Sequence, residues 1–465
     1  MSGIMLNIIS AGMGGATPVG VLASIRSTRN SIGIPRSFIK NDQLVLSVRT
    51  LSATFENEYT VAKLPLDLAT FTWQNGLSSG SNSPQIYDVT IDSADNVIVA
   101  GEIFINGFSN PAVPYLAKYN SSGTFQWNRY MNQRGRWDVV TTDASNNIYP
   151  NGTGRWSATD RDDMIYVKYP PDGASVTFQR SMSQDDGYTA ATLAYGVTIL
   201  NDTQYVMGAT AGSAPSGPPF ISNQDYQAVL GVFDRTTGNL VSALQYGSTA
   251  NIWQFGGYTI RGEAADTIYE VFTTYVTNSS SKGSMVLVKY TTAGGTVWQR
   301  EFADFSITLT GQVTCMDASN THIYAVAGTF SGAPATGRNE LQITKWDTSG
   351  NLVWQRALVS PTNSLTEPKI SVDSLDNFYL SFFSSPVSNG NRAVILKMPG
   401  SGEGSGNTVT VEGIKYDYIT TSRVASTSTL PVASFTRSRL THSIPNVANT
   451  VTIATSSLAT TTGPF

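Results

Sequence analysis

Three short segments carry side chains whose types and spacing could do chemistry. The densest run of charge is Asp160-Arg161-Asp162-Asp163, within the sequence TDRDDMIYVKY. Carboxylates are the ligands that a hard cation such as Ca²⁺ prefers, so Asp160, Asp162 and Asp163 form a candidate metal site. Their spacing does not match a calcium-loop motif, so a solvated surface loop is the favoured interpretation and the metal site is the alternative. Paired carboxylates can also hydrolyse glycosidic bonds, provided that they lie roughly 5–9 Å apart.

Two further segments carry basic and aromatic side chains suited to ligand contact. The sequence MNQRGRW contains Arg134, Arg136 and Trp137. The longest insertion, GATAGSAPSGPPFISNQDYQAV from Gly208, holds three prolines together with Phe220 and Tyr226. A proline-stiffened loop with exposed aromatic rings suits contact with carbohydrate or protein. A surface insertion without a ligand explains the same residues.

Cysteine and histidine are nearly absent from the chain. There is one cysteine, Cys315, and there are two histidines, His322 and His442, so no intrachain disulfide can form and a Cys/His zinc site is disfavoured. The chain has no phosphate-binding loop, zinc-protease motif or serine-hydrolase motif. We therefore expect no cofactor and no enzymatic activity, and we expect Cys315 to be a small buried apolar residue.

The composition excludes several classes of protein. Charged residues make up 13% of the 465 positions, about half the usual share of roughly 25%, and the net charge is −4. A nucleic-acid-binding protein would normally carry a basic surface, so this class is disfavoured. The 10% of aromatic residues excludes a mainly disordered chain. No apolar run reaches the ~18–20 residues that a membrane-spanning helix needs.

An internal repeat must position these candidate residues. One half of the repeat is VTIDSADNVIVAGE from Val89, and the other half is LVKYTTAGGTVWQREF from Leu287. Seven copies recur at a period of about 50–65 residues. Their anchor positions are Lys63, Lys118, Lys168, Phe233, Lys289, Lys345 and Lys397.

Each copy contains four β-rich segments separated by turns rich in Asp, Asn, Ser and Gly. Four-stranded units of this length, repeated four to eight times, are typical of β-propellers. We therefore predict an all-β, seven-bladed β-propeller of four-stranded antiparallel blades over residues 34–414. A six-bladed ring with the first unit outside it, and a β-solenoid, are the alternatives.

The recurrent Trp-Gln-Arg element has a structural interpretation. Trp127, Trp298 and Trp354 occupy one position per repeat, and an Arg follows two residues later in each. An amphipathic ring at a blade edge buries a large area against the next blade. We interpret this element as a tie between blades and not as a ligand site.

Two arms flank the predicted propeller. Residues 1–33 have neither the basic start nor the long apolar core of a secretory signal, so we predict an N-terminal docking arm, with a frayed terminus as the alternative. Residues 415–465 form a Ser/Thr-rich C-terminal arm, made locally basic by Arg423, Arg437 and Arg439. This arm is either a disordered end or an extended segment that adds strands to a neighbouring subunit.

The repeat resembles those of a known group of proteins. The pattern D-x-x-x-N-x-Y-x-x-G, followed by K-[YW]-x-x-x-G-x-x-x-W-Q-R, is similar to seven-bladed propeller repeats of bacterial surface proteins and of marine phage, especially cyanophage, virion proteins. It also resembles the blades of quinone-dependent dehydrogenases, which usually have eight blades, a signal peptide and a calcium site, none of which is evident here. The matching residues include Asp92, Asn96, Gly101, Lys118, Gly123, Trp127, Asp317, Gly328, Lys345, Gly350, Trp354, Gln355 and Arg356.

The resemblance implies a phage virion structural protein, on the tail rather than the capsid. In this hypothesis the arms dock to other virion proteins and join copies of the chain into a homo-oligomer, while the propeller binds a host surface glycan or protein. No nucleic acid or membrane is an expected partner. A bacterial surface or secreted binding scaffold is one alternative, and a polysaccharide-degrading enzyme is another.

Overall fold

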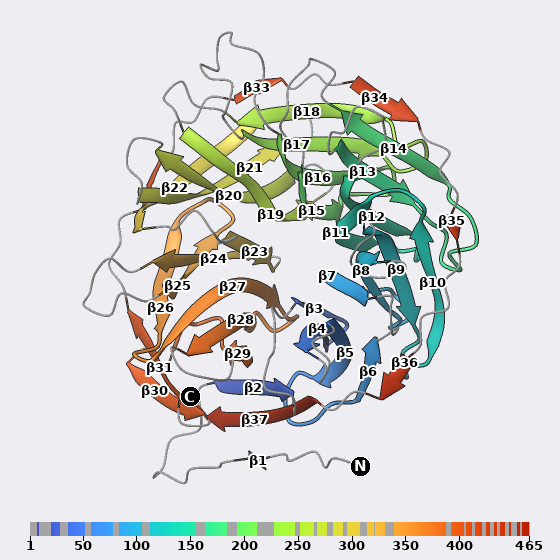
Figure 1. Cartoon of the computed structure of the whole chain (residues 1–465). Helices are drawn as coiled ribbons and strands as arrows, with labels where there is room; N and C mark the ends of the chain where they lie inside the picture. The colour runs from blue at the N-terminus through green and yellow to red at the C-terminus, as the bar shows by residue number, and fades with distance from the viewer. Residues whose placement is uncertain are drawn as a thin grey trace. The chain divides into compact units, whose positions relative to one another are not determined.

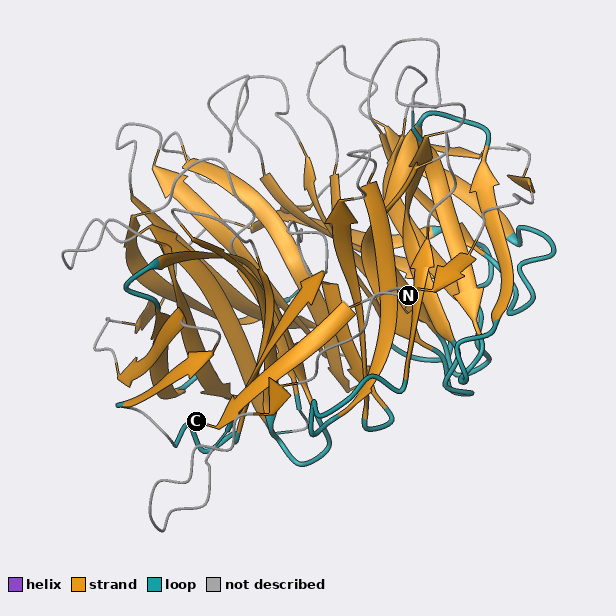
Figure 2. Ribbon diagram, turned by 60° about the horizontal axis from the view of Figure 1, so that its bottom comes forward, coloured by secondary structure: helices purple, strands orange, loops and turns teal. Residues whose placement is uncertain are grey.

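The protein is built from β-strands, as the computed structural model shows. It is described at residues 7–8, 20–27, 36–51, 57–77, 83–104, 112–154, 163–183, 193–211, 227–246, 252–264, 267–276, 282–291, 295–306, 314–319, 321–330, 339–386, 392–403, 406–411, 414–420, 425–427, 432–434, 438–441, 446–447, 453–455 and 458–464. No helix occurs within these ranges (Figure 2).

The chain divides into two compact units. The first contains Met1–Ser79, Phe305–Val424 and Thr452–Phe465, and the second contains Gly80–Asp304 and Ala425–Val451. Each unit is therefore assembled from segments that lie far apart in the sequence, and each is described below by itself.

The second unit contains four sheets among its described residues (Figure 1). In each, four consecutive antiparallel strands form a meander, and a short strand from near the C-terminus pairs with the fourth. The sheets are β7 (Ser83–Ile91), β8 (Val97–Phe104), β9 (Val113–Tyr119), β10 (Phe125–Met131) and β35 (Asn446–Val447); β11 (Gly135–Thr142), β12 (Ile148–Gly154), β13 (Asp163–Lys168), β14 (Phe178–Ser183) and β34 (Ser438–Thr441); β15 (Leu193–Ile199), β16 (Gln204–Ala211), β17 (Gln227–Asp234), β18 (Leu240–Tyr246) and β33 (Val432–Ser434); and β19 (Ile252–Ala264), β20 (Thr267–Val276), β21 (Lys282–Thr291), β22 (Thr296–Ser306) and β32 (Ala425–Thr427).

The first unit contains three sheets in the part of the chain that is described. Two of them repeat the meander, and the third combines strands from both ends of the chain. The sheets are β3 (Arg36–Lys40), β4 (Gln43–Leu51), β5 (Asn57–Pro65), β6 (Trp73–Leu77) and β36 (Ile453–Thr455); β23 (Thr314–Ala318), β24 (His322–Phe330), β25 (Asn339–Asp347), β26 (Leu352–Val359), β31 (Ile414–Thr420) and β30 (Asn407–Val411); and β27 (Asn363–Val372), β28 (Phe378–Pro386), β29 (Arg392–Met398), β2 (Val21–Ser27), β37 (Leu458–Pro464) and β1 (Asn7–Ile8).

Seven sheets, each containing a blade of four antiparallel strands, confirm the predicted fold class, a seven-bladed β-propeller. The first repeat is a blade of its own, β3 to β6, so the six-bladed alternative is wrong. The antiparallel pairing throughout the blades also excludes a solenoid of parallel repeats.

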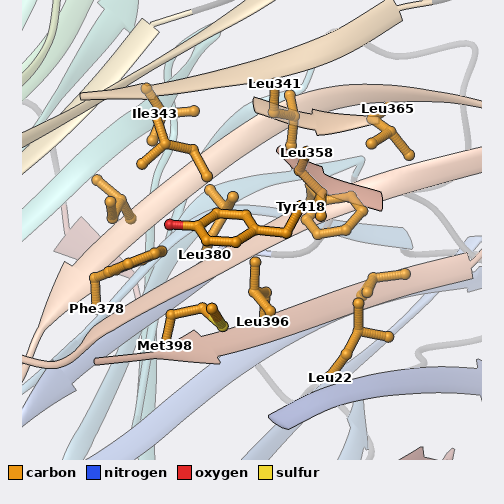
Figure 3. Packing of buried hydrophobic residues seen from close by; sticks show 14 of the residues in the cluster. Leu22, Leu341, Ile343, Leu358, Leu365, Phe378, Leu380, Leu396, Met398 and Tyr418 are labelled. Atoms are coloured by element: carbon orange, nitrogen blue, oxygen red, sulfur yellow. The ribbon is translucent and has the colours of Figure 1, made fainter. Parts of the chain in front are cut away.

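The N-terminal boundary differs from the prediction. Strand β2, which lies within the predicted arm of residues 1–33, pairs antiparallel with β29 and supplies the fourth strand of the last blade. Leu22 of β2 is fully buried and packs in one apolar cluster with Leu396 and Leu358 (Figure 3). The last repeat copy ends in a Gly-rich segment with no Trp-Gln-Arg strand, so the sheet is completed from the other end of the chain. Strand β30, at the C-terminal end of the predicted propeller span 34–414, does not join the last blade and belongs to the sheet of β23–β26.

The C-terminal segment after Ile414 differs from a free arm. Its seven strands, β31 to β37, each pair with the outer strand of one of the chain's own sheets. Their partners, in chain order, are β26, β22, β18, β14, β10, β6 and β2. The predicted strand addition therefore occurs within one chain. We call the segment from β31 to β37 the C-terminal belt.

The Asp-Asn turns of the repeat are held by their own side chains. Asp92 accepts hydrogen bonds from the backbone N–H groups of Ala94 and Asn96, and from the Asn96 side chain. Asp143 and Asp373 repeat this geometry in other blades. Burial alone would raise the pKa of Asp92, but the hydrogen bonds from Asn96 and Lys118 outweigh it and lower that pKa.

The Trp-Gln-Arg element ties adjacent blades, as predicted. In three blades the aromatic ring packs on a left-handed turn glycine of the next blade, and the following Arg donates to a carbonyl oxygen of the same turn. Arg129 Nε, for example, lies 2.8 Å from the Gly173 oxygen. The ring–glycine pairs are Trp127 on Gly173, Phe178 on Gly238 and Trp354 on Gly402.

Candidate functional site

Two β-bulges shape the first strands of neighbouring sheets in the second unit. In β7 the pairing shifts between Ile86 and Asp88, which leaves Tyr87 as the extra residue. In β11 it shifts between Trp137 and Val139, which leaves Asp138 as the extra residue. A bulge redirects the side chain of the extra residue, and bulges are frequent beside functional sites.

Glycines of the repeat make room for both bulges. A Cβ on Gly101 would stand 1.8 Å from the Gln85 carbonyl oxygen, and one on Gly152 would stand 1.9 Å from the Arg136 carbonyl oxygen. No side chain fits at either position, so these glycines are required by the bulged backbone opposite them.

Six polar side chains gather around the two bulges, and we call them the Arg136 cluster. They belong to β7, β8, β11 and β12, at the end of each sheet where β7 and β11 begin. The cluster consists of Gln85, Tyr87, Glu102, Arg136, Asp138 and Thr153.

Hydrogen bonds fix the geometry of the cluster. The Tyr87 hydroxyl donates to Glu102 Oε1 at 2.8 Å. Arg136 Nε donates to Asp138 Oδ1 at 2.6 Å, and the Thr153 hydroxyl donates to Asp138 Oδ2 at 2.9 Å. The Arg136 guanidinium carbon lies 5.2 Å from the centre of the Tyr87 ring, within the range of a cation–π contact. These contacts link the two blades into one constellation.

The cluster perturbs the titration of its charged groups. Burial raises the pKa of Glu102, although the hydrogen bond from Tyr87 and the charge of Arg136 oppose the shift. The nearby carboxylate of Asp138 raises the pKa of Arg136, which keeps the guanidinium charged. Perturbed titratable groups gathered at one end of neighbouring sheets are candidates for a functional site.

Two donors and one acceptor of the cluster have no partner among the described residues. Among the described residues, nothing accepts a hydrogen bond from Arg136 Nη1 or Nη2, and nothing donates to Glu102 Oε2. The Arg136 side chain is 35% exposed. A planar donor fork beside a carboxylate oxygen can engage two adjacent hydroxyl groups of one ligand.

The structure separates the residues predicted from MNQRGRW. Arg136 belongs to the cluster. Trp137 is 1% exposed and packs in an apolar core cluster with Met131 and Ile148, so its predicted ligand contact is wrong. Side chains alternate along a strand, and Trp137 therefore faces the sheet interior while its neighbour does not. Arg134 is exposed, and no contact joins it to the cluster among the described residues.

The other predicted site residues lie outside the described residues or on their border. Asp163 begins β13 and pairs with Gly154. Asp160, Asp162, Phe220 and Tyr226 fall outside the described ranges. No group of three or more His, Cys, Asp or Glu that could hold a metal ion is found where the structure is described.

Sequence reasoning missed Tyr87, Glu102 and Asp138. The available signal was a glycine inside a predicted strand, at Gly101 and Gly152, because such a glycine often marks a bulge. The prediction for Cys315 is confirmed, since its thiol is buried and burial raises its pKa to about 12.

No family model and no curated protein matches the sequence. Solved structures with similar folds include a protein of unknown function from Dyadobacter fermentans, at 10% identity over 82% of this chain and 99% of that chain, with a TM-score of 0.43. Another is the β-propeller domain of the Trilobed protease from Pyrococcus furiosus, at 7% identity over 77% and 97%, with a TM-score of 0.42.

A third similar structure is the hemagglutinin-neuraminidase ectodomain of parainfluenza virus 5, at 10% identity over 85% of this chain and 86% of that chain, with a TM-score of 0.37. Similarities at this level carry no argument about activity or ligand. In the described residues, no helix is long and apolar enough to cross a membrane.

Proposed function

We propose that this chain is a non-enzymatic virion structural protein, a tail-associated appendage that binds a host surface glycan through the Arg136 cluster. The observation that supports binding at this place is the donor fork of Arg136, which has no acceptor for Nη1 and Nη2 among the described residues and lies in one cluster with Glu102, on a bulged backbone that requires two glycines. The virion assignment is supported by the resemblance of the repeat and by the low share of charged residues, 13%, with Ser/Thr-rich ends.

The two ends of each sheet differ in a way that supports this assignment. Connections at one end, such as 92–96 and 143–147, are short turns whose backbone groups are satisfied by their own Asp and Asn side chains. Connections at the other end include 155–162 and 212–226, the latter being the longest between consecutive described strands of one sheet. The Arg136 cluster lies at this second end, where a scaffold presents variable connections to ligands.

The charges of the cluster favour a neutral ligand. One guanidinium stands beside the two carboxyl groups of Asp138 and Glu102, so the cluster has no excess positive charge to attract an anion. A sugar offers adjacent hydroxyl groups that both accept from Arg136 and donate to Glu102. The ligand class that fits is therefore a neutral glycan.

Binding is tested by applying the full chain to an array of bacterial surface glycans. Arg136→Ala should abolish the signal on the bound glycan, because it removes the open donors. Arg134→Ala is the matched control, since this exposed arginine is two residues away and outside the cluster, and it should bind as the wild type does. Equal binding by both variants would contradict the assignment.

Location is tested by immunogold electron microscopy of phage particles from the source culture, with antibody raised against the chain. Label on the tail is the expected result. Label confined to bacterial envelopes would reject the virion assignment and favour the alternative of a bacterial surface scaffold.

Glycoside hydrolysis is a second candidate function, favoured by the raised pKa of Glu102. Glycosidases pair a general-acid carboxyl group, whose pKa is raised by its surroundings, with a second carboxyl group, and Glu102 and Asp138 supply two carboxyl groups in one cluster. Glu102→Gln should then abolish release of reducing ends from a bound glycan while retaining binding. Absence of release by the wild-type chain across the bound glycans would reject hydrolysis.

A further inference from the structure

Strand β27, in the first unit, carries a bulge of its own. Its pairing with β28 shifts between Thr366 and Lys369, which leaves Glu367 and Pro368 opposite a single residue, Phe382. Glu367 has a φ of 53°, in the left-handed region that a residue other than glycine seldom adopts. An unfavourable backbone angle that is kept at a bulge points to a functional role for the side chain.

Strand β3 lies beside this bulge. The Ser37 hydroxyl of β3 lies 2.7 Å from the Ser381 hydroxyl of β28, and Ser381 is the cross-strand partner of Lys369. Arg36 precedes Ser37 at the start of β3, so it lies level with the bulge. The two strands therefore bring Arg36, Glu367 and Lys369 together, and we call these residues the Glu367 cluster.

The hydrogen-bonding groups of Arg36 and Glu367 are unused. In the described part of the chain, nothing accepts a hydrogen bond from the Arg36 guanidinium, and nothing donates one to the Glu367 carboxyl group. Both side chains are partly buried. Burial raises the pKa of Glu367, although the charges of Arg36 and Lys369 oppose the shift. Polar groups that lose water without pairing are costly, and a polar ligand supplies the missing partners.

The charges of the cluster favour an anionic group on that ligand. Lys369 adds a second positive charge to that of Arg36. The neighbouring carboxylate of Asp317 accepts a backbone N–H at each of its oxygens, both at 2.9 Å, so these oxygens are already engaged. Two cations thus act on Glu367, whereas the Arg136 cluster sets one guanidinium beside two carboxyl groups.

We propose that the Glu367 cluster binds a small ligand that carries both a carboxylate and a hydroxyl group, as acidic sugars and hydroxy acids do. A guanidinium donates two parallel hydrogen bonds to a carboxylate, so Arg36 takes the carboxylate of the ligand. The hydroxyl group of the ligand donates to Glu367. An ammonium group in that place would meet the positive charge of Lys369, which disfavours an amino acid. The inference does not depend on the Arg136 cluster.

Isothermal titration calorimetry of the full chain tests the site with two probes, D-glucuronate for an acidic sugar and L-lactate for a hydroxy acid. D-glucose is the matched control ligand, because it has the ring of glucuronate without the carboxylate. Arg36→Gln should weaken binding by about tenfold or more, as expected for one lost charge-assisted contact. Lys415→Gln is the matched control protein, since it removes an exposed positive charge on β31 that pairs with Asp417, and it should bind as the wild type does.

Glu367→Gly separates a binding role from a structural one. Glycine adopts a φ of 53° without strain, so this variant should keep a urea midpoint at or above that of the wild type and still lose binding of the probe. A lower midpoint together with unchanged binding would show that Glu367 serves the fold, and it would overturn the inference.

Binding of either probe, with loss in both Arg36→Gln and Glu367→Gly, supports the site, and the probe that binds more tightly identifies the source of the ligand. Absence of binding of both probes to the wild-type chain, or equally tight binding of D-glucose, would overturn the inference. Binding that Arg136→Ala removes and Arg36→Gln leaves unchanged would overturn it as well, because the ligand would then occupy the Arg136 cluster.

Discussion

Replacing Trp354 tests whether the ring–glycine contacts hold adjacent blades together. Its ring packs on Gly402, its Nε1 donates to the Gly400 oxygen at 3.0 Å, and it lies 5.9 Å from the ring of Phe378. The side chain is 8% exposed. Removing a buried tryptophan leaves a cavity between blades, so Trp354→Ala should lower the free energy of unfolding by about 3–5 kcal/mol.

The hydrogen bond and the ring contribute separately. Trp354→Phe keeps an aromatic ring and loses only the indole donor, which is worth about 1 kcal/mol. The Gly400 oxygen still accepts from Lys345 Nζ at 2.7 Å, so no buried acceptor is left unpaired by either change. Phenylalanine should therefore restore most of the stability that alanine loses.

Equilibrium urea unfolding gives the comparison, with the midpoint shift read at an unchanged m value. Val353→Ala is the matched control, because that neighbouring side chain is 50% exposed and should change the stability by less than about 0.5 kcal/mol. A loss below about 1 kcal/mol for Trp354→Ala, or a loss equal to that of the control, would refute the argument that this contact ties blades together.

Three further predictions follow from the bulges and the buried carboxyl groups. Gly152→Ala should lower stability in urea by roughly 1–3 kcal/mol, because the new Cβ would stand 1.9 Å from a carbonyl oxygen, whereas Gly295→Ala should be nearly neutral. Asp92 has a lowered pKa in the folded state, so its stabilising contribution is present above pH 3.8, the pKa of an ordinary Asp, and is lost as the pH falls below that value. The urea midpoints of the wild type and of Asp92→Asn should therefore converge between pH 5 and pH 3. Glu102 has a raised pKa in the folded state, so its favourable contribution to stability is present below pH 4.5, the pKa of an ordinary Glu, and is lost as the pH rises. Glu102→Gln should therefore gain stability relative to the wild type between pH 4 and pH 7. A difference in unfolding free energy that stays constant over this range would contradict the shift.

The blades were predictable because the residues that determine each blade lie within one repeat or in the next one. The Asp and Asn of a turn, the anchor Lys and the Trp-Gln-Arg strand all act within one blade or on the next, so their spacing is visible in a single sequence. The turn glycines that receive the aromatic rings follow the same period.

The ends and the candidate site were harder to predict for a physical reason. Strand β2, near the N-terminus, is defined by its pairing with β29 (Arg392–Met398), near the other end of the sequence. Strands β32 to β36 of the belt are too short to show an alternation of apolar and polar residues. The Arg136 cluster depends on which way two bulged residues point, and composition does not encode that direction. Only Gly101 and Gly152 mark the bulges in the sequence.

The pairing of β37 with β2 has a consequence for how the protein is made. A ribosome delivers Val21–Ser27 long before Leu458–Pro464, and before β29 as well. During that interval the apolar residues of β2, including Leu22, have no sheet to join. Contacts between residues so distant in sequence form slowly. The nascent chain should therefore depend on chaperones until its last blade is complete, and it should fold more slowly than blades of such local design would by themselves.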